Sequence, residues 1–228
     1  MKRFFLTLGA GLLAAAMAAP SFAADLPAPV YKAPPAPYIA PFSWSGFYLG
    51  INGGYGWGTS DWSSTATTGS TDPSGALVGG TLGYNLQTGY WVWGIEGDFD
   101  ASWMKGSDNT GTGVCSGANG CESKNSWFAT VRGRIGYSWH RWMPYITGGG
   151  AFTDLKMTPN GGASETDTLF GWTVGAGVEW AFAGAWSAKL EYLYADLGDA
   201  TCSAATCGVD TTVDFKTNLV RAGINYRF

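Results

Sequence analysis

The sequence predicts an all-β fold, namely an eight-stranded antiparallel up-and-down transmembrane β-barrel, and three observations lead to it. Only 13% of the 228 residues are charged, against about 25% in an average protein, whereas 15% are aromatic and 35 are glycine. Apolar side chains recur at every second position over long stretches, as in strands with two different faces. The connections between these stretches alternate between short and long, as in barrels of the bacterial outer membrane.

The first residues predict an export signal. Two basic residues precede an apolar stretch, and Ser21 and Ala23 form the small-x-small pattern of a cleavage site. Cleavage is expected after Ala23 or Ala24, and no cysteine follows that could accept a lipid. An uncleaved membrane anchor is the alternative. We assign residues 1–23 to a signal peptide.

A proline-rich tail is expected next, at residues 24–43. It contains prolines at positions 27, 29, 34, 35, 37 and 41. Because proline lacks the backbone N–H that a β-ladder needs, this stretch should be extended and semi-rigid. Its composition fits both a passive linker and a docking segment for a periplasmic partner. The barrel domain is therefore expected to cover residues 44–228.

Eight strand-like runs follow in order. They span residues 45–57, 75–86, 90–103, 126–139, 143–154, 168–181, 186–197 and 213–228. Tight turns are expected at residues 87–89, 140–142 and 183–185, and long polar loops at 58–74, 104–125, 155–167 and 198–212. An even strand number places both chain termini at the short-turn, periplasmic end of the barrel, so the four long loops are expected to be extracellular.

One face of each run is apolar, with aromatic residues toward its ends. The third run illustrates the pattern, because one face carries Trp91, Trp93, Ile95, Phe99 and Trp103. Aromatic side chains at both ends of such a row suit the two headgroup layers of a bilayer. This face is expected to contact lipid.

The opposite face of the runs is small or charged, and its charges lie in the middles of the strands. An eight-stranded barrel is only just wide enough for its inward side chains, and a buried charge without a partner is costly. We therefore expect acids and bases to pair across a filled lumen, and ion conduction is the alternative. The expected lumenal charge network consists of Glu96, Asp98, Asp100, Arg132, Arg134, Glu179, Lys189, Glu191 and Arg221.

Four cysteines occur as two close pairs, each inside one predicted loop. Three pairings are open to four cysteines, and proximity in an exported chain favours Cys115 with Cys121 and Cys202 with Cys207. Each bridge should stabilise its loop by roughly 2 to 3 kcal/mol. A zinc site is the alternative, but the only histidine, His140, is distant in the sequence.

No arrangement of residues predicts catalysis. His140 lies in a tight turn at the end opposite the long loops, without the neighbouring nucleophile that a Ser–His–acid triad needs. The glycine clusters TGGGAF and GWTVGAGVEW lack the helix and the lysine of phosphate-binding loops. We expect neither an enzyme nor a cofactor or metal. A net charge of −4 also argues against nucleic acid as a partner.

Seven segments together resemble a known family. In chain order they are FSWSGFYLGINGGYGWG, GTLGYNLQ, RGRIGYSW, PYITGGGAF, GWTVGAGVEWAF, KLEYLYADLG and the terminal RAGINYRF. They are similar to the small alphaproteobacterial outer-membrane proteins of the RopB type, which include rhizobial and Brucella surface proteins and the Bartonella hemin-binding proteins. The resemblance implies a porin-like outer-membrane barrel with a role in envelope integrity, host interaction or, in one branch, hemin binding. No catalytic or hemin-ligating position carries over to this sequence.

The chain ends in LVRAGINYRF, which predicts the closing strand of the barrel. Phe228 and Tyr226 fall on the lipid-facing side and resemble the signal read by the barrel-assembly machinery. The expected partners are that machinery, outer-membrane lipid and lipopolysaccharide. The expected function is a structural, surface-exposed barrel, with a narrow porin for small solutes and loop-mediated binding of hemin or a host ligand as alternatives.

Overall fold

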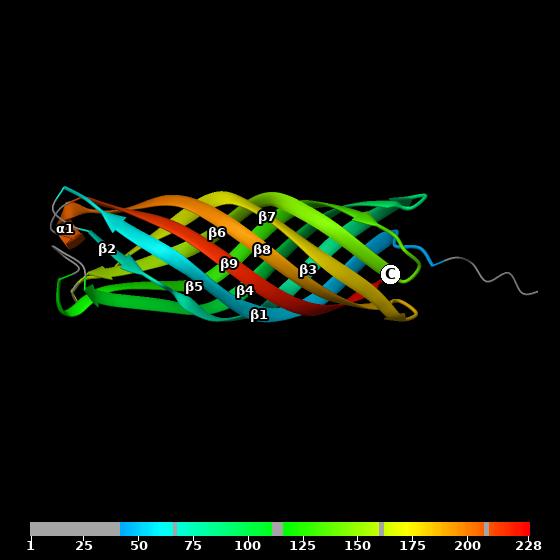
Figure 1. Cartoon of the computed structure of the whole chain (residues 1–228), viewed down its shortest axis with the longest axis horizontal. Coiled ribbons are helices and arrows are strands. Elements are labelled where there is room, and N and C mark those ends of the chain that lie inside the picture. The colour runs from blue at the N-terminus through cyan, green and yellow to red at the C-terminus, as the bar shows by residue number, and fades with distance from the viewer. Residues whose placement is uncertain (1–41, 66–67, 111–115, 160–161, 208–209) are drawn as a thin grey trace, which may run out of the picture. The chain divides into compact units, whose positions relative to one another are not determined.

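The computed structural model describes residues 42–65, 68–110, 116–159, 162–207 and 210–228. The predicted signal peptide and residues 24–41 of the predicted tail lie outside the described residues. Within them, eight long strands, one short strand and one helical turn occur (Figure 1). These elements are β1 (Gly46–Ser63), β2 (Thr68–Thr71), β3 (Ser74–Thr88), β4 (Trp91–Thr110), β5 (Ser116–Tyr137), β6 (Trp142–Pro159), β7 (Glu165–Ala183), β8 (Trp186–Cys202), α1 (Ala204–Cys207) and β9 (Thr211–Arg227).

The strands form one antiparallel sheet that closes into a barrel. Each long strand pairs with the next along the chain, and β9 returns to pair with β1. The closing register runs from Tyr48 opposite Arg227 to Ser63 opposite Thr212. The C-terminus lies at the end of the barrel that carries the three tight turns (Figure 1). The predicted eight-stranded up-and-down barrel is thus confirmed.

The short strand β2 is a continuation of the second barrel strand. Both β2 and β3 pair with β1 in an unbroken register, since Thr71 lies opposite Ser60 and Ser74 lies opposite Trp57. The interruption falls at Pro73, which has no N–H to donate to the ladder. Its carbonyl still accepts the N–H of Gly58 at 2.9 Å.

The strands reach far into the segments predicted as long loops. β5 begins at Ser116 instead of residue 126, and β1 continues to Ser63 instead of ending at residue 57. Segments rich in Gly, Ser and Thr look like loops in the sequence, but here each has a neighbouring strand that completes its hydrogen bonds. A membrane strand needs about 9 to 11 residues, whereas β3 has 15 and β5 has 22. The barrel is therefore longer than a bilayer is thick.

The two faces of the sheet differ as the alternating pattern predicts. Many outward side chains are large and apolar, with Ile51 70% exposed and Phe170 66% exposed. Inward side chains alternate with them and are buried. None of the described residues forms a helix long and apolar enough to cross a membrane.

Candidate functional site

All nine side chains predicted to form the lumenal charge network are buried inside the barrel. They come from β4, β5, β7, β8 and β9, where alternation turns every second residue inward. Arg221 and Asp100 are fully buried, and Asp98, the most accessible of the nine, is 6% exposed. Five carboxylates thus share the middle of the lumen with four cations.

Arg132 and Arg221 form the centre of this network. The guanidinium of Arg132 contacts Glu96 Oε1 at 2.7 Å, Asp98 Oδ2 at 3.0 Å and Glu191 Oε2 at 2.9 Å. Arg221 contacts Asp98, as well as Asp100 Oδ2 at 2.7 Å and Glu191 Oε1 at 2.6 Å. Because the two guanidinium groups share two carboxylates, strands β4, β5, β8 and β9 are tied together across the lumen.

Arg134 lies one layer nearer the short-turn end. It pairs with Glu179 Oε2 at 2.6 Å and Glu96 Oε2 at 3.2 Å. Its guanidinium lies over the ring of Tyr145 at 4.4 Å and that of Tyr48 at 5.4 Å, in the geometry of a cation–π contact. The charge is therefore held between two acids and two aromatic faces.

The two tyrosines also donate hydrogen bonds to the carboxylates, and the sequence analysis did not predict this role for them. Tyr48 donates its hydroxyl to Glu96 at 2.7 Å, and Tyr145 donates to Glu191 at 3.1 Å. The signal was available in their position, because Tyr48 stands between the outward residues Phe47 and Leu49 and must therefore point inward.

Lys189, Ser187 and Asn225 complete the network. Lys189 Nζ lies 3.2 Å from Glu96 Oε1. Glu179 accepts hydrogen bonds from the hydroxyl of Ser187 at 2.5 Å and from Nδ2 of Asn225 at 2.9 Å. Every carboxylate of the network thus has a charged partner, as buried acids require.

The outer part of the lumen holds an apolar core that the sequence analysis did not predict. Its residues continue the inward rows beyond the charges, so that Leu219 stands two positions from Arg221 and Leu193 two positions from Glu191. The predicted charge network accordingly fills the middle of the lumen and not its whole length. The larger members of this outer core are Trp62, Leu77, Met104, Phe128, Leu155, Met157, Leu169, Leu193, Leu197, Val213, Phe215 and Leu219.

A smaller apolar cluster closes the short-turn end of the lumen. Trp44 is 1% exposed and packs with Val92, Met143 and other buried residues, and Phe42 packs against this cluster. The guanidinium of Arg227 lies 4.4 Å from the centre of the Phe42 ring. Phe42, which the prediction placed in the tail, therefore contacts the barrel.

The three cysteines that the structure describes, Cys121, Cys202 and Cys207, lie inside the outer core. Cys202 and Cys207 form a disulfide across α1, and both are buried, which confirms the predicted local pairing. Cys121 is also disulfide-bonded; its predicted partner, Cys115, lies outside the described residues. His140 is exposed in the turn between β5 and β6, with a φ of 57°, at the short-turn end where the sequence placed it.

The C-terminal aromatics lie on the outer face near the short turns. The ring of Tyr226 packs against Trp186 at 4.9 Å and against Phe228 at 5.2 Å. The backbone N–H of Phe228 donates to the carbonyl of Phe47 at 2.9 Å. The last residue is thus part of the seam that closes the barrel. Recognition of this end by the assembly machinery stays a prediction.

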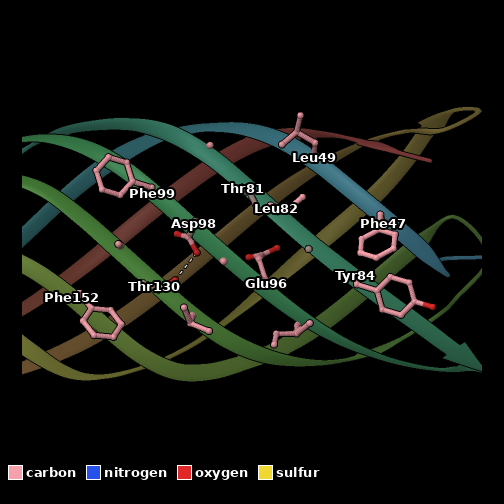
Figure 2. Close-up of a pocket in the computed structure, with 16 residues that line it drawn as sticks. Phe47, Leu49, Thr81, Leu82, Tyr84, Glu96, Asp98, Phe99, Thr130 and Phe152 are labelled. Carbon is pink, nitrogen blue, oxygen red and sulfur yellow. Dashed lines mark hydrogen bonds between the residues drawn. The ribbon is translucent and has the colours of Figure 1, made fainter.

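The outer wall itself has a hollow of about 610 Å³. Figure 2 shows Phe47 and Tyr84 toward one end of it and Phe99 and Phe152 toward the other. Its floor is formed by small outward residues, among them Gly97. A Cβ on Gly97 would meet nothing closer than the carbonyl of Thr130 at 3.8 Å, so close backbone packing does not require a glycine there.

Comparison of the whole chain with known proteins gives consistent matches. A family model for an outer membrane protein β-barrel domain matches residues 9–228. The chain is 38% identical to a 31 kDa outer-membrane immunogenic protein of Brucella melitensis, over 95% of this chain and 97% of that protein. It is 35% identical to a 25 kDa outer-membrane immunogenic protein of Brucella abortus, over 92% of each. It is 36% identical to a 22 kDa outer membrane protein of Rhizobium leguminosarum, over 82% of this chain and 79% of that protein.

Solved structures match the fold at low sequence identity. The outer membrane protein OprG of Pseudomonas aeruginosa superposes with a TM-score of 0.54 at 14% identity, covering 81% of this chain and 97% of that one. The outer membrane protease OmpT of Escherichia coli gives 0.53 at 9% identity, covering 80% and 97%. At such identities these likenesses concern the barrel fold alone.

Proposed function

Because the chain belongs to the family of outer membrane β-barrel proteins, and hence to the outer membrane, we propose that it acts there as a structural, surface-exposed barrel with a closed lumen. The observation that carries this proposal is the continuous filling of the lumen. An apolar cluster around Trp44, the charge network around Arg132 and Arg221, and the outer core around Phe215 follow one another along the barrel.

The energetics of these layers oppose a conducting path. A solute crossing the middle layer would have to separate Arg132 or Arg221 from its carboxylates, and breaking a buried ion pair costs about 3 to 5 kcal/mol. It would then have to enter an outer core made of side chains such as Trp62, Phe128 and Phe215. A narrow porin is disfavoured on both counts.

The role at the cell surface is supported by the length of the strands and by the relatives. The outer parts of β1, β4 and β5 extend beyond what a bilayer needs. Two of the relatives are named outer-membrane immunogenic proteins, and we infer that the outer rim of this chain is likewise exposed. The buried acids are all engaged in ion pairs, which favours a structural role for them over a catalytic one.

Planar-bilayer recording of the purified full chain tests the closed lumen. We expect a baseline without discrete current steps at protein concentrations at which a known porin, reconstituted in parallel, gives regular openings. A preparation from cells that lack the gene controls for contaminating porins. Reproducible steps of constant size that appear only with this protein would contradict the proposal.

A further inference from the structure

Three lysines lie side by side on the outer face of the barrel, toward the end opposite the three tight turns. Lys105 of β4 pairs in register with Lys124 of β5, which in turn pairs with Lys156 of β6. Directly opposed residues of neighbouring strands have Cβ atoms about 5 Å apart, and like charges in that position destabilise a sheet. We call these three residues the lysine row. It costs stability unless an anion neutralises it.

No ion pair neutralises the row within the part of the chain that the structure describes. The nearby carboxylate of Asp154 is engaged elsewhere, because its Oδ1 accepts the backbone N–H groups of Ser126 at 2.9 Å and Trp127 at 3.0 Å. Glu122 is exposed and stands opposite Ser107 and Thr158. By contrast, Lys216 on β9 contacts Asp214 at 2.9 Å.

The lysine row lies just beyond the aromatic level of the wall. Trp103 shares a face with Lys105 two residues along β4 and is 55% exposed. On the next strand, Trp127 stacks on Phe99 with ring centres 5.9 Å apart. Tryptophans on the outer face of a barrel mark the headgroup layer of a membrane. The three ammonium groups therefore lie at the height of the lipid headgroups.

The hollow in the wall lies on the three strands that carry the lysine row and on the adjoining β1 and β3, on the membrane side of these tryptophans. Phe99 and Phe152 bound it at the end that is nearer the lysine row, and Gly80 and Gly97 line it (Figure 2). A Cβ on Gly80 would meet nothing closer than a carbonyl at 3.7 Å, so the depression is open to a ligand from the membrane. Along the outer wall, from the rim toward the middle of the membrane, the lysine row is thus followed by aromatic rings and then by the apolar hollow.

This order matches the order of groups in one anionic lipid. We propose that the lysine row binds the phosphates of lipid A, the phosphorylated glycolipid anchor of lipopolysaccharide, and that one of its acyl chains lies in the hollow. Lysine is a common ligand of phosphate, and clustered basic residues beside a membrane bind anionic headgroups. The site depends on the outer-membrane location of the chain but not on whether its lumen is closed.

The opposite wall of the barrel could not hold the same ligand. There Asp61 of β1 stands in register with Asp214 of β9, which also stands in register with Asp199 of β8. A row of carboxylates repels phosphate. Phosphate binding should therefore be confined to the part of the wall that carries the lysine row, on β4 to β6, and Lys216, which lies among these acids, provides a matched control.

The test is a titration of the purified full chain, in uncharged detergent micelles, with diphosphoryl lipid A. At low salt a basic residue near an anionic lipid contributes about fivefold in affinity. We expect Lys124→Gln to weaken binding about fivefold and the triple variant K105Q/K124Q/K156Q to weaken it about 100-fold. Lys216→Gln, which changes the net charge as Lys124→Gln does, should leave the affinity unchanged. Enzymatically dephosphorylated lipid A should have the same weak affinity for the wild type and for the triple variant, because it lacks the phosphates that the lysines would bind.

A stability measurement in lipid-free micelles separates ligand binding from a structural role. Because removing the central cation relieves like-charge repulsion, Lys124→Gln should unfold at the same or a higher urea concentration than the wild type. Equal lipid A affinity of the wild type and the triple variant would overturn the proposal. So would an equal loss in Lys216→Gln, which would indicate a general charge effect, or a loss of stability in Lys124→Gln that matches its loss of affinity.

Discussion

At the scale of single residues, the lumen depends on shared partners. Arg132 and Arg221 each contact three carboxylates, and both contact Asp98 and Glu191. Removing one guanidinium therefore leaves several buried acids with fewer counter-charges. The cost of an uncompensated buried charge exceeds the net gain from forming the pair, so these arginines should be among the most sensitive positions of the chain.

Replacing Arg221 by leucine should lower the free energy of unfolding by about 3 to 5 kcal/mol, because Asp98, Asp100 and Glu191 lose a common partner. Urea unfolding in detergent micelles, followed by tryptophan fluorescence, measures the change. Arg141→Leu is the control, since Arg141 is exposed in a turn and its replacement should shift the value by no more than about 0.5 kcal/mol. A similar midpoint for Arg221→Leu and the wild type would count against the network as a source of stability.

At the scale of elements, one contact fastens the connection after β8 to the start of β7. The carboxylate of Glu165 accepts the backbone N–H of Ser203 at 3.0 Å and its hydroxyl at 2.9 Å. Ser203 follows Cys202, the first cysteine of the disulfide. The backbone N–H of Ser203, with its hydroxyl, lowers the pKa of the Glu165 carboxyl below its ordinary value, because both donors favour the charged form.

This lowered pKa predicts a pH-dependent anchor. A carboxyl whose pKa is lower in the folded state contributes its stability fully above its ordinary pKa of about 4.3, and that contribution is lost as the pH falls through the folded value. Amide hydrogen exchange at Ser203, corrected for the intrinsic pH dependence, should therefore lose protection on acidification below about pH 4. Glu165→Gln should show weaker protection that does not change over the same range. Protection that stays constant in the wild type would show that the carboxylate does not hold this connection.

Period-two alternation identifies both faces of each strand, and it places the nine lumenal charges on the inward one. The lengths of the strands could not be predicted, because a segment such as residues 116–125 gains its strand conformation from neighbours that the local sequence does not specify. The outer core was missed for the same reason, since residues such as Trp62 and Leu155 fall in segments predicted as loops.

The lysine row could not be predicted from the sequence for a different reason, which is the irregular register of its strands. Register between strands shifts at irregular positions, between Ala101 and Met104 of β4 and between Lys124 and Phe128 of β5. Such bulges cannot be counted from one sequence. Only the structure therefore brings the three lysines opposite one another.

At the scale of the whole molecule, closure of the barrel depends on its last residues. β9 pairs with β1 along most of its length, and Phe228 extends this seam through its hydrogen bond to Phe47. The exposed aromatic pair Tyr226 and Phe228 stands at the short-turn end. This end of the chain is thus well placed to be recognised before the barrel closes.

Deleting Phe228 should reduce the amount of barrel in the outer membrane severalfold while leaving the interior of the assembled molecules unchanged, because the side chain of this residue is exposed on the outer face. Immunoblots of outer-membrane fractions measure the amount, and the urea midpoint of the purified variant measures the interior. Phe228→Tyr, which retains an aromatic ring, serves as the control. Normal outer-membrane levels of the deletion variant would contradict a role in assembly.

The alternation of faces described for every strand has a further consequence for how the chain can change over time. An outward side chain such as Ile51 contacts fluid lipid chains, which adapt to any apolar shape, whereas an inward one such as Arg221 contacts side chains in fixed positions. Mutations should therefore be tolerated at one position and rejected at the next. We therefore expect lipid-facing positions to accept substitutions between apolar residues freely, and lumenal positions to change little among related proteins.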